Sequence, residues 1–259
     1  MGKDGQMVFF NSSLKGKFLG DKKYFERDFI LSQLNNRKGI NQEIYERALN
    51  GLEYLSQMRD MGLDPIFKGG SAVQLLIPES IQRLSIDIDL VIDSTEKEIT
   101  SILKLIHNKF NQKIYNFDRV GSKELPPHLV LYNIYIPSLF SENPSKIALD
   151  FLLHKPNYKI QQTPIKTFIY ESNLTVKTPT INSLVGDKLT VICPNTIGKE
   201  MSKDPLNFAK QIYDIATLLE YSNNFIEIFD AFYDVFIFEK KNKFFTNFYD
   251  KKKLHLNDR

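Results

Sequence analysis

Apolar side chains recur every three to four residues in several stretches of the chain, which is the period of an amphipathic α-helix. In residues 42–61 they form one continuous stripe, and Gly62 follows at a position where helices commonly end. The same period predicts further helices at 22–35, 71–77, 95–110, 181–193, 204–221 and 223–240.

A period of two residues is typical of a strand with one buried face. The segment SIDIDLVID shows this period, with Ile86, Ile88 and Leu90 on one face and Asp87 and Asp89 on the other. Further strands are predicted at 65–67, 112–118, 128–137 and 146–153, and a hairpin-like pair at 157–178.

The order of these elements predicts an α/β plus α fold, in which flanking helices cover a mixed sheet. We expect N-terminal helices in residues 1–62, a core with the sheet in 63–178, and a helical C-terminal domain in 179–259 that closes an active-site cleft.

Composition does not indicate a protein that holds nucleic acid by its bulk charge. The 259 residues include 34 Lys and Arg against 31 Asp and Glu, a net charge of +3. The end of the chain is locally basic, because Lys240, Lys241, Lys243 and Lys251 to Lys253 alternate with Phe244, Phe245, Phe248 and Tyr249. This end is either a solubilising helix end with apolar residues docked on the body or a nucleic-acid contact.

Cys193 is the only cysteine, which excludes an intramolecular disulfide and a cysteine-based zinc site. The histidines show no spacing typical of metal ligands. No apolar run approaches the roughly 20 residues of a membrane span, and the N-terminus has no signal-peptide pattern. A cytoplasmic location is therefore expected.

The turn Lys68-Gly69-Gly70-Ser71 joins a predicted strand to a predicted helix. At such a turn, backbone N–H groups point outward at the positive end of the helix dipole, and glycine lets a phosphate approach closely. Ser71 adds a hydroxyl donor. Alone, the motif is more typical of a tight structural turn.

Asp87 and Asp89 are two residues apart on a strand, so both side chains project from one face. Two carboxylates in this arrangement suit Mg²⁺, which prefers a few carboxylates together with water and substrate phosphates. Alone, they would also fit an exposed strand face. Asp150 lies in the apolar strand KIALDFLL, where an acid is costly unless it is paired or binds a metal, and it is the candidate third acid.

The segments FKGGSAVQLL and RLSIDIDLVI together resemble the AbiEii/MenT-type nucleotidyltransferases, toxin components of bacterial abortive-infection and toxin–antitoxin systems. These belong to the DNA polymerase β-like nucleotidyltransferase superfamily, whose motif is Gly-Ser, a spacer, then Asp-x-Asp. Further similar elements are Glu26-Arg27-Asp28-Phe29, Asp187-Lys188-Leu189 and Lys210-Gln211-Ile212-Tyr213-Asp214. The spacer of 15 residues exceeds the shortest superfamily form, and Asp150 matches the wider superfamily rather than a fixed motif of the toxin group.

The resemblance implies a minimal nucleotidyltransferase fold and a role for each matching residue. Gly70 and Ser71 would hold nucleotide phosphates, and Asp87 and Asp89 would bind Mg²⁺. Lys188 would contact the triphosphate. Asp214 would act as a base or orient Lys188, while Arg83 and Ser85 would stabilise the loop or touch phosphate. Without the family, Lys188 and Asp214 would be ordinary helix residues.

The implied reaction is transfer of a nucleoside monophosphate from a triphosphate such as ATP, GTP or CTP to an acceptor hydroxyl. By resemblance the acceptor would be the 3′ end of a tRNA and the partner a cognate antitoxin. Two alternatives stay open: transfer to a small molecule or a protein side chain without a toxin role, or a descendant that binds nucleotide without catalysis.

Overall fold

The computed structural model describes residues 17–35, 37, 39–110, 114–121, 125–193 and 204–241. The chain forms two compact units, the first from 1–154 and 162–177, and the second from 155–161 and 178–259. The expected N-terminal helical segment and most of the expected core therefore lie in the same compact unit.

The helices of the first unit follow the predicted order, with one interruption near the N-terminus. They are the 3₁₀ turns η1 (Lys22–Phe25) and η2 (Glu79–Ile81) and the helices α1 (Arg27–Asn35), α2 (Gln42–Asp60), α3 (Gly69–Leu76) and α4 (Glu96–Lys109). The expected helix at 22–35 is divided because Glu26 has an extended backbone, and Phe25 stacks on Phe18 in the core. Gly62 follows α2 with a φ of 91°, as its predicted end position requires.

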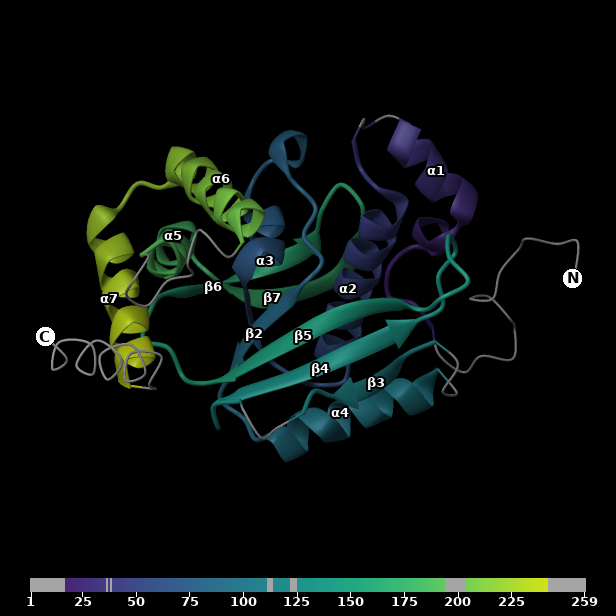
Figure 1. The fold of residues 1–259 in the computed structure, drawn as a ribbon, viewed down its shortest axis with the longest axis horizontal. Helices are drawn as coiled ribbons and strands as arrows, with labels where there is room; N and C mark the ends of the chain where they lie inside the picture. Colours follow the sequence, from purple (N-terminus) through teal and green to yellow (C-terminus); the bar gives the residue numbers. More distant parts are fainter. Residues whose placement is uncertain are drawn as a thin grey trace, which may run out of the picture. The chain divides into compact units, whose positions relative to one another are not determined.

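The seven strands form one mixed sheet in the order β3-β4-β5-β2-β1-β7-β6 (Figure 1). Pairing is parallel between β2 and β5 and between β1 and β7, and antiparallel between β1 and β2, β3 and β4, and β4 and β5. The strands are β1 (Ile66–Lys68), β2 (Ile88–Ile92), β3 (Asn116–Arg119), β4 (Leu129–Ile136), β5 (Ser145–Leu153), β6 (Ile160–Lys166) and β7 (Glu171–Pro179). The predicted mixed sheet with flanking helices is confirmed.

Helix α2 is buried on most of its surface and carries a buried carboxylate, Glu53. This carboxylate accepts hydrogen bonds from the backbone N–H groups of Leu19 and Gly20 and from the hydroxyl of Tyr170. Burial raises the pKa of Glu53, although these hydrogen bonds oppose the shift. The cluster ties the chain before η1 to the helix that supports the sheet.

The second unit contains the predicted C-terminal helices, α5 (Ile181–Val191), α6 (Pro205–Tyr221) and α7 (Phe225–Lys241). Helices α6 and α7 both pack against α5 (Figure 1). At Gly186 the backbones of α5 and α7 come very close, since a Cβ atom there would overlap the carbonyl oxygen of Ile228 and lie 2.7 Å from the nitrogen of Phe232.

Within the described part of the chain, none of the helices combines the length and the apolar character that crossing a membrane requires. Lys240 and Lys241 end α7, whereas the rest of the basic end lies outside the described residues: Lys243, Phe244, Phe245, Phe248, Tyr249 and Lys251 to Lys253.

Candidate active site

The turn between β1 and α3 brings a carboxylate against a glycine. Gly69 has a φ of 72°, a conformation that favours glycine. A Cβ atom at this position would overlap the carboxylate of Asp89, approaching its Cγ to 2.6 Å. Gly69 is therefore required both for the backbone conformation and for the position of Asp89. The sequence analysis assigned no role to Gly69, although the Gly-Gly doublet before a helix was a signal for it.

Asp89 and Asp150 lie opposite one another on neighbouring strands. The parallel pairing of β2 and β5 places the two residues in register, so their side chains share one face of the sheet. Both are half-buried. Asp150 thus lies on the strand next to the acidic strand, where the third acid was expected, and the register of the two strands places it opposite Asp89.

Asp87 lies immediately before β2, because the strand begins at Ile88 and is shorter than the alternating pattern suggested. Its side chain is exposed. The buried hydroxyl of Ser71 donates a hydrogen bond to the backbone carbonyl oxygen of Asp87 at 2.5 Å. Ser71 therefore holds the start of the acidic strand beside α3, and its predicted contact with phosphate stays a prediction.

Arg83 and Ser85 converge on Gly70. A Cβ atom on Gly70 would lie 2.8 Å from Nη2 of Arg83 and 2.9 Å from Oγ of Ser85. The guanidinium and the hydroxyl thus reach the glycine turn from the segment between η2 and β2. This arrangement places one cation and one hydroxyl beside the first turn of α3, where helices favour anions.

In the second unit, Lys188 of α5 and Asp214 of α6 form a buried ion pair. Nζ of Lys188 lies 2.9 Å from Oδ2 of Asp214, and the side chains are 3% and 0% exposed. The same ammonium donates to Oε1 of Gln211 at 3.0 Å. The sequence analysis named Gln211 within a motif but assigned it no role. Because Gln211 lies three residues before Asp214, on the same helix face, its position near Lys188 could have been predicted.

Among the residues that the structure describes, no three His, Cys, Asp or Glu side chains are gathered in a group that could hold a metal ion. Mg²⁺ does not need such a group, since one or two carboxylates usually hold it together with water and substrate phosphates. The three predicted ligands Asp87, Asp89 and Asp150 are therefore not gathered as such a group, and their binding of Mg²⁺ stays a prediction. The carboxylates of Asp89 and Asp150, in register on neighbouring strands, are donors of the kind that Mg²⁺ prefers.

The family comparison covers the part of the chain that contains the glycine turn and the acidic strand. Residues 59–258 match the model of the family described as nucleotidyl transferase AbiEii toxin, Type IV TA system. The chain belongs to the AbiEii nucleotidyl transferase toxin family. The matched range contains every predicted site residue, whereas the similar element Glu26 to Phe29 precedes it.

No curated protein matches this AbiEii chain. Two solved structures are similar to this chain. In each, the sequence identity is 12% and the match covers 97% of the solved chain. One is a candidate nucleotidyltransferase from H. pylori, with a TM-score of 0.42 over 76% of this chain. The other is JHP933 from Helicobacter pylori, with a TM-score of 0.39 over 81% of this chain.

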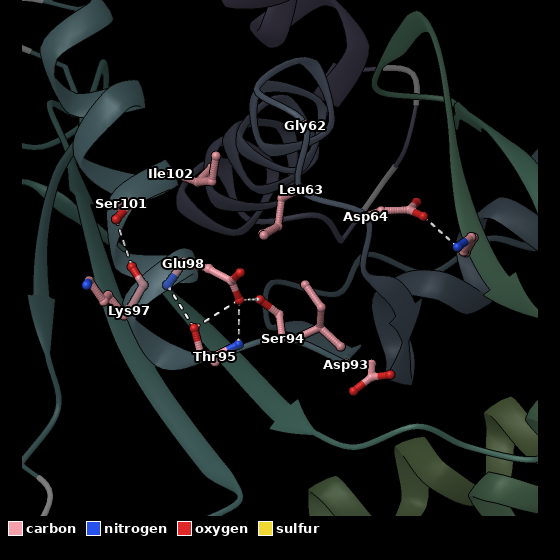
Figure 2. A pocket seen from close by; sticks show the side chains of 12 residues that line it. Gly62, Leu63, Asp64, Asp93, Ser94, Thr95, Lys97, Glu98, Ser101 and Ile102 are labelled. Carbon is pink, nitrogen blue, oxygen red and sulfur yellow. Dashed lines mark hydrogen bonds and ion pairs between the residues drawn. The ribbon is translucent and has the colours of Figure 1, made fainter.

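The AbiEii chain also has a cavity of about 770 Å³ at the other end of β2 (Figure 2). It is lined by residues after α2, after β2 and at the start of α4, and none of the predicted site residues belongs to it. Glu98 closes the capping box of α4 there with Thr95. Asp64 lies in the wall of this cavity. Partial burial raises the pKa of Asp64, but Lys177 and Arg59 outweigh this effect and hold the pKa below its ordinary value.

Proposed function

We propose that the protein is a Mg²⁺-dependent nucleotidyltransferase that moves a nucleoside monophosphate from a nucleoside triphosphate to an acceptor hydroxyl. The observation that carries the proposal is the contact of Asp89 with Gly69, at the point where α3 begins and beside Asp150. Metal-binding carboxylates and an anion-binding turn are the two components that such a transfer needs.

In the proposed reaction the acceptor hydroxyl loses its proton to water, its oxygen attacks the α-phosphorus, and the bond from that phosphorus to the β-phosphate oxygen breaks, so that pyrophosphate leaves. Mg²⁺, when bound, supplies neutralisation of phosphate charge and activation of the hydroxyl. Asp87 and Asp89 would hold the metal, with Asp150 in support. The backbone of the Gly69–Gly70 turn and the guanidinium of Arg83 bind phosphate oxygens. The Ser71 hydroxyl positions Asp87 by its hydrogen bond to the backbone carbonyl oxygen of Asp87.

Lys188 is the proposed triphosphate contact of the second unit. Of the two roles left open for Asp214, base or orientation of Lys188, the ion pair favours orientation, because the Asp214 carboxylate is fully buried against the ammonium. Gln211 adds a second fixed point for Nζ. A lysine held by two acceptors keeps its charge in one place, which suits electrostatic preorganisation.

We further propose that the acceptor is the 3′ end of a tRNA and that the protein acts as a toxin restrained by a cognate antitoxin. The support for this part is membership of a toxin family of type IV toxin–antitoxin systems. A cytoplasmic location follows from a tRNA substrate.

The reaction is tested by incubating the protein and Mg²⁺ with each labelled triphosphate in the presence of total RNA. Label in tRNA supports the full proposal, and label in a small molecule or in protein supports transfer without the RNA substrate. Absence of pyrophosphate release with every triphosphate contradicts catalysis. The toxin role is tested by expression in cells: growth arrest that disappears with Asp87→Ala supports it, and unimpaired growth with the wild type contradicts it.

A further inference from the structure

Residues 82–87 connect η2 to β2 and lie outside the helices and strands. This segment carries Arg83, the proposed phosphate contact, and Asp87, a proposed metal ligand. The position of a connection without regular secondary structure depends mainly on its side-chain contacts. The contacts at the two ends of the segment therefore decide how precisely these two residues are placed.

Gln82 begins the segment, and its side-chain amide makes three hydrogen bonds. Nε2 donates to the backbone carbonyl oxygens of Gln74 at 2.7 Å and Ile77 at 3.0 Å. Oε1 accepts from the backbone N–H of Phe168 at 3.2 Å. Both hydrogens of the amide nitrogen are thus used, and an amide turned over would place its oxygen against two carbonyl oxygens. The side chain therefore has one orientation that satisfies all three partners.

The three partners of Gln82 belong to two well-anchored parts of the first unit. Gln74 and Ile77 lie at the C-terminal end of α3, where helix carbonyl groups need partners from outside the helix. Phe168 lies in the turn between β6 and β7, which Tyr170 anchors in the core. Gln82 therefore connects the start of the segment to α3 and to this turn at the same time.

Arg37 holds η2 against the same turn. Its guanidinium lies over the ring of Phe168, 3.7 Å from the centroid, and both terminal nitrogens lie 3.3 Å from the backbone carbonyl oxygen of Glu79, to which they donate. Because Arg37 and Gln82 both contact Phe168, the chain that enters the segment is fixed at residues 79 and 82.

The far end of the segment is held at the first turn of α3. The Ser71 hydroxyl donates to the carbonyl oxygen of Asp87, and the guanidinium of Arg83 lies beside Gly70. The segment thus follows α3 from its C-terminal end, at Gln82, to the glycine turn at its N-terminus. Displacement of either end would move the guanidinium relative to the glycine turn.

We propose that Gln82 is a positioning residue, which places Arg83 for its contact with the phosphates of the triphosphate. The inference rests on the proposed nucleotidyl transfer and adds to it the contacts that hold its cation in place. A cation stabilises phosphate charge best when its position is set before the substrate binds. Loss of the Gln82 hydrogen bonds should therefore weaken binding of the triphosphate.

The test is steady-state nucleotidyl transfer with Mg²⁺, total RNA and a range of concentrations of the triphosphate that the wild type uses. Gln82→Met keeps the length of the side chain and removes its hydrogen bonds. We expect the KM for the triphosphate to rise about tenfold, while kcat falls less than about threefold. A merely structural role would lower the amount of folded protein, and with it the apparent kcat, at unchanged KM.

Gln162→Met is the matched control. Gln162 is exposed on β6, in the same hairpin as Phe168, and its side-chain oxygen accepts a hydrogen bond from the hydroxyl of Thr175. This substitution also replaces a hydrogen-bonded glutamine by methionine, but the hydrogen bond it removes lies within the hairpin. The KM for the triphosphate should therefore stay at the wild-type value.

A double-mutant cycle tests whether Gln82 acts through Arg83. In an Arg83→Met background the guanidinium is absent, so Gln82→Met should raise the KM further by less than about twofold. Two effects that multiply in full would contradict the proposal, because Gln82 would then act independently of Arg83.

Gln82→Glu separates the two sides of the contact and serves as a second variant if Gln82→Met does not fold. A carboxylate still accepts from the N–H of Phe168 but repels the carbonyl oxygens of α3, so the KM should rise at least about tenfold. A wild-type KM in this variant contradicts the connection to α3. Absence of transfer by the wild type contradicts the proposed function and this inference together, whereas wild-type transfer with an unchanged KM in Gln82→Met contradicts this inference alone.

Discussion

At the scale of single residues, the candidate site depends on two glycines, because neither carries a side chain that would displace its neighbours. Gly69 has no side chain where the Asp89 carboxylate lies, and Gly70 has none where Arg83 and Ser85 converge. A methyl group at either position would occupy space that charged side chains now fill. The acidic strand and the glycine turn therefore constrain one another, and a small change in one should be measurable in the other.

Gly69→Ala tests this dependence, with Gly62→Ala as its matched control. Both residues have a positive φ, so each substitution should lower the free energy of unfolding by about 1–2 kcal/mol. Only the Cβ atom at position 69 meets Asp89; at Gly62 nothing lies within 4 Å. We expect a loss of nucleotidyl transfer of about 100-fold for Gly69→Ala alone. Equal activity of the two variants would contradict the proposed role of the turn.

The ion pair of Lys188 and Asp214 permits separation of stability from catalysis. Lys188→Met leaves a buried carboxylate without its cation and should cost about 3–5 kcal/mol of unfolding free energy in denaturant titrations. The double variant with Asp214→Leu should recover most of this loss, because both charges are removed together. Transfer should stay lost in both variants, since Lys188 is the proposed phosphate contact. Nucleotidyl transfer by the double variant would contradict the proposed phosphate contact and would show that the ion pair has a structural role alone.

At the scale of elements, the alternating pattern and the helical stripes predicted most helices and strands within a few residues. The pattern did not predict that Asp87 lies outside β2 or that Glu26 interrupts the first helix, because backbone conformation there depends on tertiary contacts: the Ser71 hydrogen bond and the burial of Phe25. Nor did it predict that Asp150 pairs with Asp89, since strand register is a long-range property.

Gly186→Ala tests the close contact of α5 with α7. Alanine in a helix normally adds up to about 1 kcal/mol of stability over glycine. Here the methyl group would meet the backbone of α7, so we expect a net loss of about 1–3 kcal/mol. Gly51→Ala in α2 is the control, because its Cβ atom would meet side chains rather than backbone, the closest atom being Cδ1 of Ile88 at 3.1 Å. A smaller loss at position 186 than at 51 would contradict the tight contact.

Asp64 connects the start of β1 with Lys177 of β7 and Arg59 of α2. These cations lower its folded-state pKa below the ordinary 3.8, so the pairing stabilises the protein above that pH and is lost as the pH falls through the folded-state pKa. We expect Asp64→Asn to cost at most about 1 kcal/mol at pH 7, because the pair is partly exposed. In thermal unfolding, the difference in Tm between wild type and Asp64→Asn should become smaller at pH values below 3.8, and a larger difference there would contradict this account.

At the scale of the whole molecule, the central claim joins family and geometry. The AbiEii family match supports the reaction class, and in the first unit Asp89, in register with Asp150 on the neighbouring strand, lies against the glycine turn. Gly70, Ser71, Asp87 and Asp89 were predicted from the sequence because their spacing follows local structure, whereas the contact of Gly69 with Asp89 and the register of Asp150 came from the structure. The Gln211 contact with Lys188 had to come from the structure, since it joins two helices.

The most direct measurement is the rate of pyrophosphate release from a triphosphate with an acceptor RNA, compared between wild type and Asp89→Asn, each with Mg²⁺ and with excess chelator. The account predicts release by the wild type that the chelator abolishes, and a loss of at least about 100-fold in Asp89→Asn at unchanged circular dichroism. A folded Asp89→Asn variant with wild-type release, or release that persists without divalent metal, would contradict it.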